Sequence, residues 1–521
     1  MKRRQSFKVV FILTVLLLTI SAGMLSGFAA ESKELKAIAA PLADVNARDN
    51  DNIYASDGYD HGYVPNITAV QNSDGSYAVC INQNNGTLKI VETDGKKITS
   101  EITIEKELID FGAFTQGMDG TYYVLFGNRI DDGDQSKTAL RLVNYNADGE
   151  KIRSLDMPGN ASGSFEGVAA IGYGNNTLIE NGSLITGYVG RLLFTSSIEG
   201  LVHQASYAFA VNTSTFEQVT VPNSTVIPYA SHSFHQYILD DGESLLYVDR
   251  SDAEPKRSFH LTKMSGDNRW TLLAKGDSFI FKGEYGYNDT FSQLGGVVKT
   301  SAGYLLVSSY QNTTQGTEYS PANLVTQLFN PTTLASQPEK VLTDYKGTRA
   351  EGVTNPKAVL IGKNKVAVPY MVSNQFTESK RMYIAMLDAY GNLTENFAVK
   401  TNAVLPRFGQ VMYNSDTNCV EWFSIADGKL IMYSIDLSEG YTPETTTAPP
   451  AATEPTTDNE PTETTTSVDA STNAPQETTT APATTQPEAE PPTQEPAEPN
   501  SWQKIVNFFM GIYNWFISLF M

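Results

Sequence analysis

The feature that most limits the fold of this 521-residue chain is a series of turn dipeptides between about residues 50 and 440. Asp-Gly and Asn-Gly recur there between short apolar or alternating runs, and no long stretch has the apolar period of a helix. These dipeptides supply the positive φ angles that tight hairpins require. The pattern predicts short antiparallel strands joined by hairpins at Asp74-Gly75, Asn85-Gly86, Asp94-Gly95, Asp119-Gly120, Asp148-Gly149, Asn181-Gly182, Asp241-Gly242 and Asp427-Gly428.

The hairpins group into a repeated unit of four strands. Residues 66–104 show it most clearly, with strands expected at 67–71, 77–82, 87–92 and 97–104. An aromatic or acidic residue followed by Gly or a polar pair opens each later copy, about 54 to 69 residues after the one before. These openings are Phe111-Gly112, Phe165-Glu166-Gly167, Phe234-His235-Gln236, Phe291-Ser292-Gln293, Glu351-Gly352 and Phe408-Gly409-Gln410.

With a first unit near Asn66, the openings predict seven units. A four-stranded sheet cannot bury both of its faces alone, so consecutive sheets must stack, and a ring also hides the end units. The seventh unit has three clear strands, at 409–413, 419–423 and 430–435. Its fourth strand is expected from residues near 33–45 or 52–55, which would close the ring.

The hairpin spacing and the strand openings resemble those of secreted bacterial β-propellers over roughly residues 50–440. The resemblance is one of architecture. It implies a seven-bladed β-propeller of four-stranded antiparallel sheets, which we place at residues 31–440. The fold class expected for the chain is therefore all-β, with a disordered linker and a short C-terminal amphipathic helix after the propeller, as the composition of those segments predicts below. Two β-sandwiches are the alternative, although they need no such period.

The two ends of the chain differ from this middle. Residues 1–30 have a basic start, an apolar run from Val9 to Ile20 and small residues at Gly27 and Ala29, the pattern of a secretory signal peptide. A retained transmembrane anchor is the alternative. Residues 441–500 are half Thr and Pro, acidic and without Lys or Arg. Such a segment cannot bury enough apolar surface to fold, which predicts a disordered linker like the spacers of Gram-positive surface proteins.

The last segment, residues 501–521, has polar or small residues every three or four positions within an aromatic sequence. That period predicts a helix with a narrow polar stripe, suited to the membrane interface. A helix that docks onto a protein partner is the alternative. The side chains expected to contact the membrane are Trp502, Phe508, Phe509, Trp515, Phe516 and Phe520.

Charge and composition exclude several kinds of function. The net charge of −21 repels phosphate backbones, so nucleic acid is not an expected partner. Two cysteines exclude a thiolate zinc cluster, and five histidines, scattered except for His232 and His235, argue against a histidine-built metal site. Cys80 and Cys419 either pair after export or remain two buried thiols. No cofactor is expected, apart from weak calcium binding near Asp131, Asp132 and Asp134, where a solvated turn is the alternative.

Candidate ligand-binding residues cluster where the fourth unit opens and where its second strand ends. In a propeller both places lie at one rim, close to the axial mouth where ligands usually bind. Other unit openings contribute to the same rim, and the alternative for all of them is a polar ring that only keeps the blades in register. The candidates are His232, His235, Asp249, Asp252, Glu254, Arg257, Glu166, Glu351 and Arg407, with Asp110, Asp289 and Arg349 as further openings.

Two classes of function fit these residues. The first is a non-catalytic, envelope-associated binding module for a glycan or a protein, or a scaffold for another extracytoplasmic protein. The second is a carbohydrate-active hydrolase with a carboxylate pair in the axial mouth. No clear catalytic pair is visible, which favours the binding module. The segment Ser265–Trp270 partly resembles the Asp-box turn of sialidases, but it occurs once, with Arg269 where that turn has glycine.

Overall fold

The computed structural model describes most of the region expected to fold. The described residues are 34–47, 64–128, 134, 136–159, 174–195, 202–219, 230–233, 235–251, 253, 256–281, 292–311, 321–346, 351–374 and 377–438. They all belong to the first of two compact units, residues 1–445, and the second unit is residues 446–521. The expected signal peptide, linker and C-terminal helix lie outside the described residues.

All regular structure in the described residues is β, as predicted, and it is arranged in repeated antiparallel sheets. Four sheets have four strands each, and one has three. Their strands are β2 (Ile67–Gln71), β3 (Tyr77–Asn82), β4 (Thr87–Thr93) and β5 (Ile98–Glu105); β6 (Asp110–Gln116), β7 (Tyr122–Gly127), β8 (Thr138–Tyr145) and β9 (Lys151–Pro158); β10 (Thr177–Glu180), β11 (Leu184–Thr195) and β12 (Val202–Asn212); β13 (Tyr237–Asp240), β14 (Ser244–Ser251), β15 (Ser258–Ser265) and β16 (Leu272–Asp277); and β17 (Gln293–Thr300), β18 (Gly303–Tyr310), β19 (Asn323–Phe329) and β20 (Lys340–Val341). The meander predicted for residues 66–104 is therefore confirmed.

A nine-stranded sheet contains the remaining strands. It joins β1, from the start of the described chain, to the strands nearest its end. One part of it is β21 (Gly352–Thr354), β22 (Val359–Ile361), β23 (Lys365–Asn374), β24 (Thr377–Asp388) and β25 (Leu393–Lys400), and the other is β26 (Val411–Asn414), β27 (Cys419–Ala426) and β28 (Lys429–Asp436). We call these two parts and the five separate sheets the strand groups, numbered in chain order.

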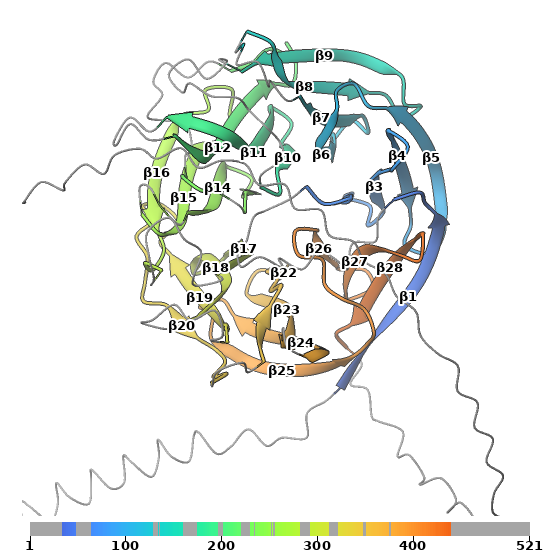
Figure 1. Ribbon diagram of the computed structural model, residues 1–521. Helices are drawn as coiled ribbons and strands as arrows, with labels where there is room; N and C mark the ends of the chain where they lie inside the picture. Colours follow the sequence, from blue (N-terminus) through green and yellow to red (C-terminus); the bar gives the residue numbers. More distant parts are fainter. Residues whose placement is uncertain are drawn as a thin grey trace, which may run out of the picture. The chain divides into compact units, whose positions relative to one another are not determined.

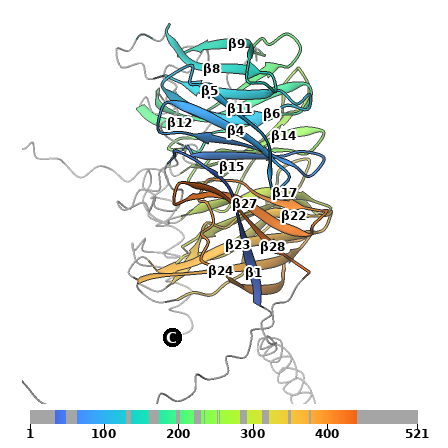
Figure 2. The ribbon, with the colours of Figure 1, turned by 90° about the vertical axis from the view of Figure 1, so that its right-hand side faces the viewer.

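Strand β1 (Glu34–Asp44) lies between the last two strand groups. It pairs antiparallel with β28, from Ala37 opposite Ile435 to Asp44 opposite Lys429. Its first residues also pair in parallel with β25. The prediction that residues near 33–45 supply the missing outer strand is confirmed, and the alternative segment 52–55 lies outside the described residues. Figure 2 shows β1, in blue, among the orange strands of the last groups.

The turn dipeptides behave as predicted. The glycines of all eight dipeptides named above have positive φ, for example +87° at Gly86 and +80° at Gly120. Side chains within the turns complete them: Asp119 Oδ1 accepts a hydrogen bond of 3.0 Å from the backbone N–H of Thr121. Because glycine adopts this conformation without steric cost, the local sequence alone determines where each hairpin reverses.

Apolar side chains fill the spaces between consecutive strand groups. The described core residues form seven clusters, and each cluster draws on two neighbouring groups. Cys80 and Val124 share the cluster between the first and second groups, and Val79 and Ile425 share the one between the first and the last. The groups therefore follow one another around a common centre in a β-propeller-like arrangement, as Figure 1 shows.

The core also shows the surroundings of Phe111 and of the two cysteines. Phe111 is buried in the cluster between the first and second groups, so this opening phenylalanine packs between sheets. Cys80 is fully buried in β3, Cys419 is only half-buried, and no disulfide joins them, so the prediction of two buried thiols is right for Cys80 and wrong for Cys419. Burial raises the pKa of the Cys80 thiol, which keeps it protonated and unreactive.

The closing strand offers a direct test of its contribution to stability. Leu35 of β1 is 2% exposed and packs in the cluster between the last two groups, whereas Ile38 of the same strand is 59% exposed. We expect Leu35→Ala to lower the free energy of unfolding by about 2–5 kcal/mol, because it leaves a cavity where the ring closes.

The matched control is Ile38→Ala, which should change the free energy of unfolding by less than about 0.5 kcal/mol. Urea unfolding followed by tryptophan fluorescence measures both. Equal effects of the two substitutions would show that β1 does not hold the ring closed.

Candidate functional site

The candidate residues lie at one end of the strand groups. In a four-stranded meander the first strand begins, the second ends, the third begins and the fourth ends at the same edge. Ser251 at the end of β14 is paired with Ser258 at the start of β15, and His260 is paired with Asp277 at the end of β16. We call this end of the strand groups the rim. The labelled first strands β6, β10, β17 and β26 lie toward the centre of the ring in Figure 1.

His235 is buried at the rim, directly before β13. Its ring Nδ1 accepts a 3.0 Å hydrogen bond from the backbone N–H of Leu294, which belongs to the next strand group. The backbone N–H of His235 donates to Asp249 Oδ1 at 3.2 Å. Burial, and then the charges of Arg250 and Lys357, hold the pKa of His235 well below its ordinary value. A neutral His235 therefore links two sheets, which is the structural role that the polar-ring alternative describes.

Other opening residues form the same kind of link. Asn175 Oδ1 accepts from the N–H of Gln236 at 2.6 Å, and Gln293 Oε1 accepts from the N–H of Asn355 at 2.8 Å. Gln410 Oε1 accepts from the N–H of Ala69 at 3.4 Å, between the last group and the first. The glutamines of two Phe-x-Gln openings, Gln293 and Gln410, are thus hydrogen-bond acceptors for the neighbouring inner strand. At the third opening Gln236 is the backbone donor, and its acceptor, Asn175, is a residue that no motif indicated.

Asp249 and Arg250 lie side by side in β14, and both are fully buried. Burial raises the pKa of Asp249 to about 7, although hydrogen bonds from Ser233 and from the His235 and Arg250 backbones favour its ionised form. Arg250 Nη1 donates to the carbonyl of Ser292 at 3.1 Å. The sequence indicated Asp249 as a candidate, but it did not distinguish Arg250 from the exposed arginines of the chain.

Two further basic residues approach the same place from the last two groups. Lys357, between β21 and β22, donates from Nζ to the carbonyl of Arg407 at 2.7 Å. Burial lowers the pKa of Lys357 to about 7 and that of Arg407 to about 10. The Arg407 guanidinium lies 5.2 Å from the centre of the Phe408 ring. Sequence reasoning identified Arg407 and missed Lys357, which no motif surrounds.

His235 and Phe408 bring these residues together. Their rings meet edge to face, with centroids 4.9 Å apart, although they precede the inner strands of the fourth and seventh groups. Strand groups that are not neighbours in the ring can meet in this way only near its centre. We call His235, Arg250, Lys357, Arg407 and Phe408 the central basic cluster.

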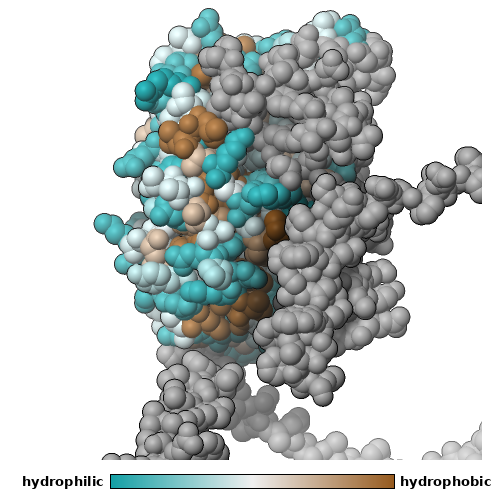
Figure 3. Space-filling model, turned by 90° about the vertical axis from the view of Figure 1, so that its left-hand side faces the viewer, coloured by the Kyte–Doolittle hydropathy of each residue, from teal (hydrophilic) through white to brown (hydrophobic). Residues whose placement is uncertain are grey.

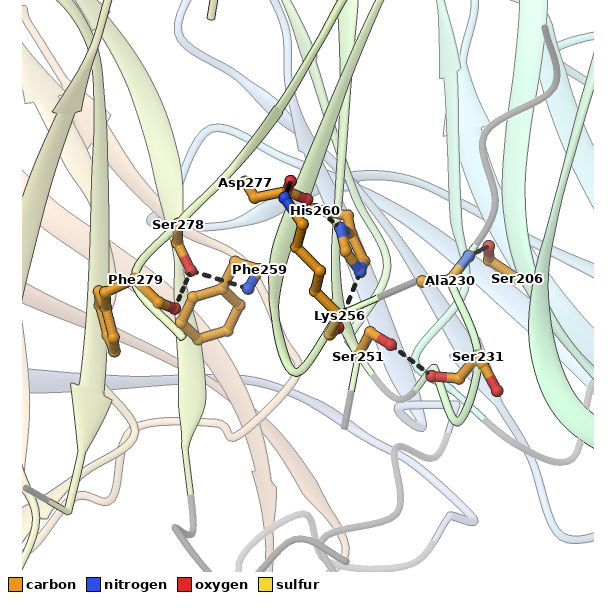
Figure 4. A network of polar contacts seen from close by, with 10 residues as sticks. All are labelled: Ser206, Ala230, Ser231, Ser251, Lys256, Phe259, His260, Asp277, Ser278 and Phe279. Atoms are coloured by element: carbon orange, nitrogen blue, oxygen red, sulfur yellow. Dashed lines mark hydrogen bonds and ion pairs between the residues drawn. The ribbon is translucent and has the colours of Figure 1, made fainter. Parts of the chain in front are cut away.

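A second polar network lies farther out on the rim, in the fourth strand group. Figure 4 shows His260 between Asp277 and Lys256. His260 Nδ1 is 2.6 Å from Asp277 Oδ1, its Nε2 is 3.0 Å from the carbonyl of Lys256, and Lys256 Nζ donates to Asp277 Oδ2 at 2.5 Å. The hydrogen bond from His260 is the largest cause that lowers the pKa of Asp277 to about 2. This network holds the segment that joins β14 to β15.

The other rim candidates are distributed as follows. Arg257 is buried beside this network, and His232 is half-buried with a φ of +51°. Glu351 is half-buried and forms an ion pair with Arg381, and Asp110 is half-buried at the start of β6. The candidates outside the described residues are Asp252, Glu254, Glu166, Asp289 and Arg349.

No calcium site is visible in the part of the chain that the structure describes. Asp131 and Asp132 lie outside it, and Asp134 accepts hydrogen bonds from the N–H and the hydroxyl of Ser136. No group of three or more His, Cys, Asp or Glu side chains among the described residues could hold a metal ion.

The Asp-box-like segment lies at the opposite end from the rim, in the turn between β15 and β16. Asp267 Oδ1 accepts from Ser265 Oγ at 2.9 Å, and Trp270, which is buried, donates from Nε1 to the hydroxyl of Tyr247 at 2.9 Å. The segment is therefore a turn whose tryptophan anchors it in the core, and it adds no group to the candidate site.

Comparisons with known proteins add little to this description. No protein-family model matches the chain, and no curated protein matches it. Among solved structures, extracellular domains 1–2 of Drosophila Semaphorin 1a align with 75% of this chain and 88% of their own, at 9% identity and a TM-score of 0.39. Because the overlap is so loose, the fold assignment rests on the chain's own sheets, clusters and pairings.

The role of His235 as an acceptor leads to a prediction on pH. The folded chain keeps His235 neutral, while the unfolded chain binds a proton below pH 6.5, so stability falls as pH decreases below 6.5. We expect this one residue to remove up to about 1.4 kcal/mol per pH unit in that range. His235→Asn retains an acceptor but cannot titrate, so urea unfolding at pH 7.5 and 5.0 should show a smaller pH dependence for the variant.

His235→Ala separates the hydrogen bond from the charge. It leaves the half-buried Leu294 N–H without its His235 acceptor, and we expect the free energy of unfolding to fall by about 1–3 kcal/mol at pH 7.5. If the wild-type chain and His235→Asn have the same pH dependence, His235 is protonated in the folded protein and the acceptor role is wrong.

Proposed function

We propose that residues 31–440 form a seven-bladed β-propeller that acts as a non-catalytic binding module, with a glycan or a protein as its ligand. The blade count is supported by the strand groups and by the clusters that separate them. In this proposal β1 is the fourth strand of the last blade, and residues that follow β12 complete the third blade.

The observation that carries the proposed binding function is the difference between the two ends of the strand groups. The rim collects buried basic groups in its central basic cluster, and the half-exposed Lys256–Asp277–His260 network lies farther out on it. Six of the eight Asp-Gly and Asn-Gly hairpins lie at the opposite end, whereas Asn85-Gly86 and Asp427-Gly428 lie at the rim. The buried side chain of Asp241 at the opposite end is paired with Lys299 at 3.0 Å. A buried charge without a charged partner lowers stability, so its presence points to a function. We therefore prefer the rim as the ligand face.

Binding is preferred to hydrolysis because of the state of the carboxylates at the rim. A glycosidase needs two carboxyl groups open to one substrate. Among the described candidates, Asp249 is fully buried, Glu351 is paired with Arg381, and Asp110 is half-buried at the start of β6, so one candidate carboxyl group is left rather than a pair. This arrangement gives a catalytic pair no support in the described part of the rim.

The proposed location follows from the ends of the chain. We propose that residues 1–30 direct export, that residues 441–500 act as a spacer, and that residues 501–521 contact the membrane or envelope. The described residues contain no helix long and apolar enough to span a membrane. Nucleic acid is not a proposed partner, given the net charge of −21.

The ligand face is tested with rim residues that are not fully buried, because buried ones would also affect stability. Lys256 has a side chain that is 53% exposed, and the half-buried His232 follows Ser231, whose carbonyl accepts from Ser251 Oγ at the end of β14 at 2.8 Å. We expect the full-length double variant His232→Ala, Lys256→Ala to lose binding on a glycan array or to a surface-protein panel, by about tenfold or more.

The matched control for this experiment is Arg269→Ala. Arg269 has a 78% exposed side chain at the opposite end of the same strand group, and it pairs with Asp267. Its loss should leave binding unchanged. Equal loss of binding in both variants would place the ligand elsewhere, and release of free sugar from an array glycan would contradict the non-catalytic proposal.

The tail is tested by truncation. Trp502, Phe508 and the other apolar residues of the last segment lose free energy if they stay in water, because each large side chain is worth roughly 1.5–3 kcal/mol when buried. We expect the full chain to fractionate with the cell envelope and a chain ending at Asn500 to be released as a soluble monomer. If both chains appear equally in the medium, the tail is not an anchor.

A further inference from the structure

Lys357 is a buried basic residue of the rim whose charge has no charged partner among the described residues. The residue is 8% exposed, and its Nζ donates to one backbone carbonyl, that of Arg407, at 2.7 Å. No ion pair to Lys357 is present among the described residues, and burial is what shifts its pKa. A buried ammonium that is held by a single neutral acceptor lowers stability, because it gives up its hydration for little in return.

The basic groups around Lys357 add to this cost rather than relieve it. The charges of Arg250 and Lys357 both lower the pKa of His235, so the three groups lie close to one another. Arg407 and Phe408 complete the cluster, with the guanidinium over the ring and the ring against His235. Asp249 lies beside the cluster, where its Oδ1 accepts from the His235 backbone N–H at 3.2 Å. Burial gives Asp249 and Lys357 each a pKa of about 7, so both are partly charged near neutral pH and Asp249 compensates the cluster only in part.

Backbone carbonyls hold two of the bases of the cluster. Arg250 Nη1 donates to the carbonyl of Ser292 at 3.1 Å, and Lys357 Nζ donates to the carbonyl of Arg407 at 2.7 Å. A carbonyl carries no net charge, so it does not neutralise the Lys357 ammonium. A small group with oxygen acceptors and one negative charge would give that ammonium a charged partner.

We propose that the central basic cluster, anchored by Lys357, binds a carboxylate group. This inference rests on the proposed function and names the part of the ligand that the rim recognises: an acidic sugar or an acidic amino-acid side chain contributes the carboxylate. A carboxylate suits the cluster because its two oxygens lie in one plane and can meet an ammonium and a guanidinium together. The ring of Phe408 supplies an apolar surface beside it.

The experiment uses the full-length chain and acetate as the probe. Acetate binding is measured by isothermal titration calorimetry, and thermal unfolding is followed in sodium acetate and in sodium chloride at equal ionic strength. We expect acetate to raise the unfolding temperature more than chloride and to saturate, as a ligand of the folded state does. Lys357→Met should weaken acetate binding by about 10- to 100-fold, because it removes a charged hydrogen bond.

Lys363→Met is the matched control. Lys363 is exposed in the turn after β22, so this variant removes the same charge without touching the cluster, and its acetate affinity should equal that of the wild type. Lys357→Met should be at least as stable as the wild type without acetate, because it removes a desolvated charge. If Lys357→Met does not fold, the acetate affinity of Lys357→Gln is measured instead. The unfolding temperature of the wild type in acetate and in chloride is then the second test of the carboxylate site.

The outcomes separate this inference from the proposed function. Equal effects of acetate and chloride on the wild type, or an unchanged acetate affinity in Lys357→Met, would overturn the carboxylate site. The glycan and protein panels could still show a ligand at the rim in that case. Acetate binding that depends on Lys357, without any panel ligand, would support the site and count against the binding-module proposal. A stronger response to phosphate than to acetate would overturn the choice of carboxylate.

Discussion

Each strand group has two faces, and neither can be covered by the group itself. The described core consists of clusters shared between neighbours, so every group depends on the one before it and the one after it. Apolar burial of this kind is proportional to area and has no direction, so it favours stacking but does not limit the number of sheets. The number of sheets is limited by β1. This strand pairs with β28 and β25, so the last strand groups are continuous with the start of the described chain.

Closing the ring puts hydrogen bonds between sheets at both ends of the strands. At the rim, Gln293, Gln410 and His235 accept from backbone N–H groups of the next inner strand. At the opposite end, Asp241 of a hairpin turn accepts from Lys299 Nζ at 3.0 Å in the following group. These bonds have direction, so they can set the register of neighbouring sheets that apolar contact leaves undefined. The polar-ring interpretation of the openings therefore holds for these residues.

The same geometry explains why the rim can also carry a function. Inner strands converge on the centre of the ring, so side chains from the fourth, sixth and seventh groups come within contact of each other there. That convergence brings together Arg250, Lys357 and Arg407, whose mutual repulsion is not a requirement of the fold. Arg250 and Lys357 also donate to carbonyls of the next group, so these bases contribute hydrogen bonds between sheets as the acceptor residues do. Their charge, which those neutral carbonyls do not compensate, is the part that the fold does not need.

Much of the fold follows from the sequence by itself. The position of each hairpin is local, because Asp-Gly and Asn-Gly adopt their turn conformations in any context, and strands such as β2 and β3 follow from the alternation between turns. The need for a closing strand also follows, because the last unit lacks one. The candidate site follows only in part. Sequence position placed His235 and Asp249 at the rim, but their burial depends on the neighbouring sheet, which no local pattern describes. Lys357 has no motif around it, and its surroundings come from residues about 50 to 120 positions away in the chain. Turn chemistry depends on near neighbours and can be seen in the sequence, whereas desolvation and charge coupling depend on contacts that exist only after the ring has closed.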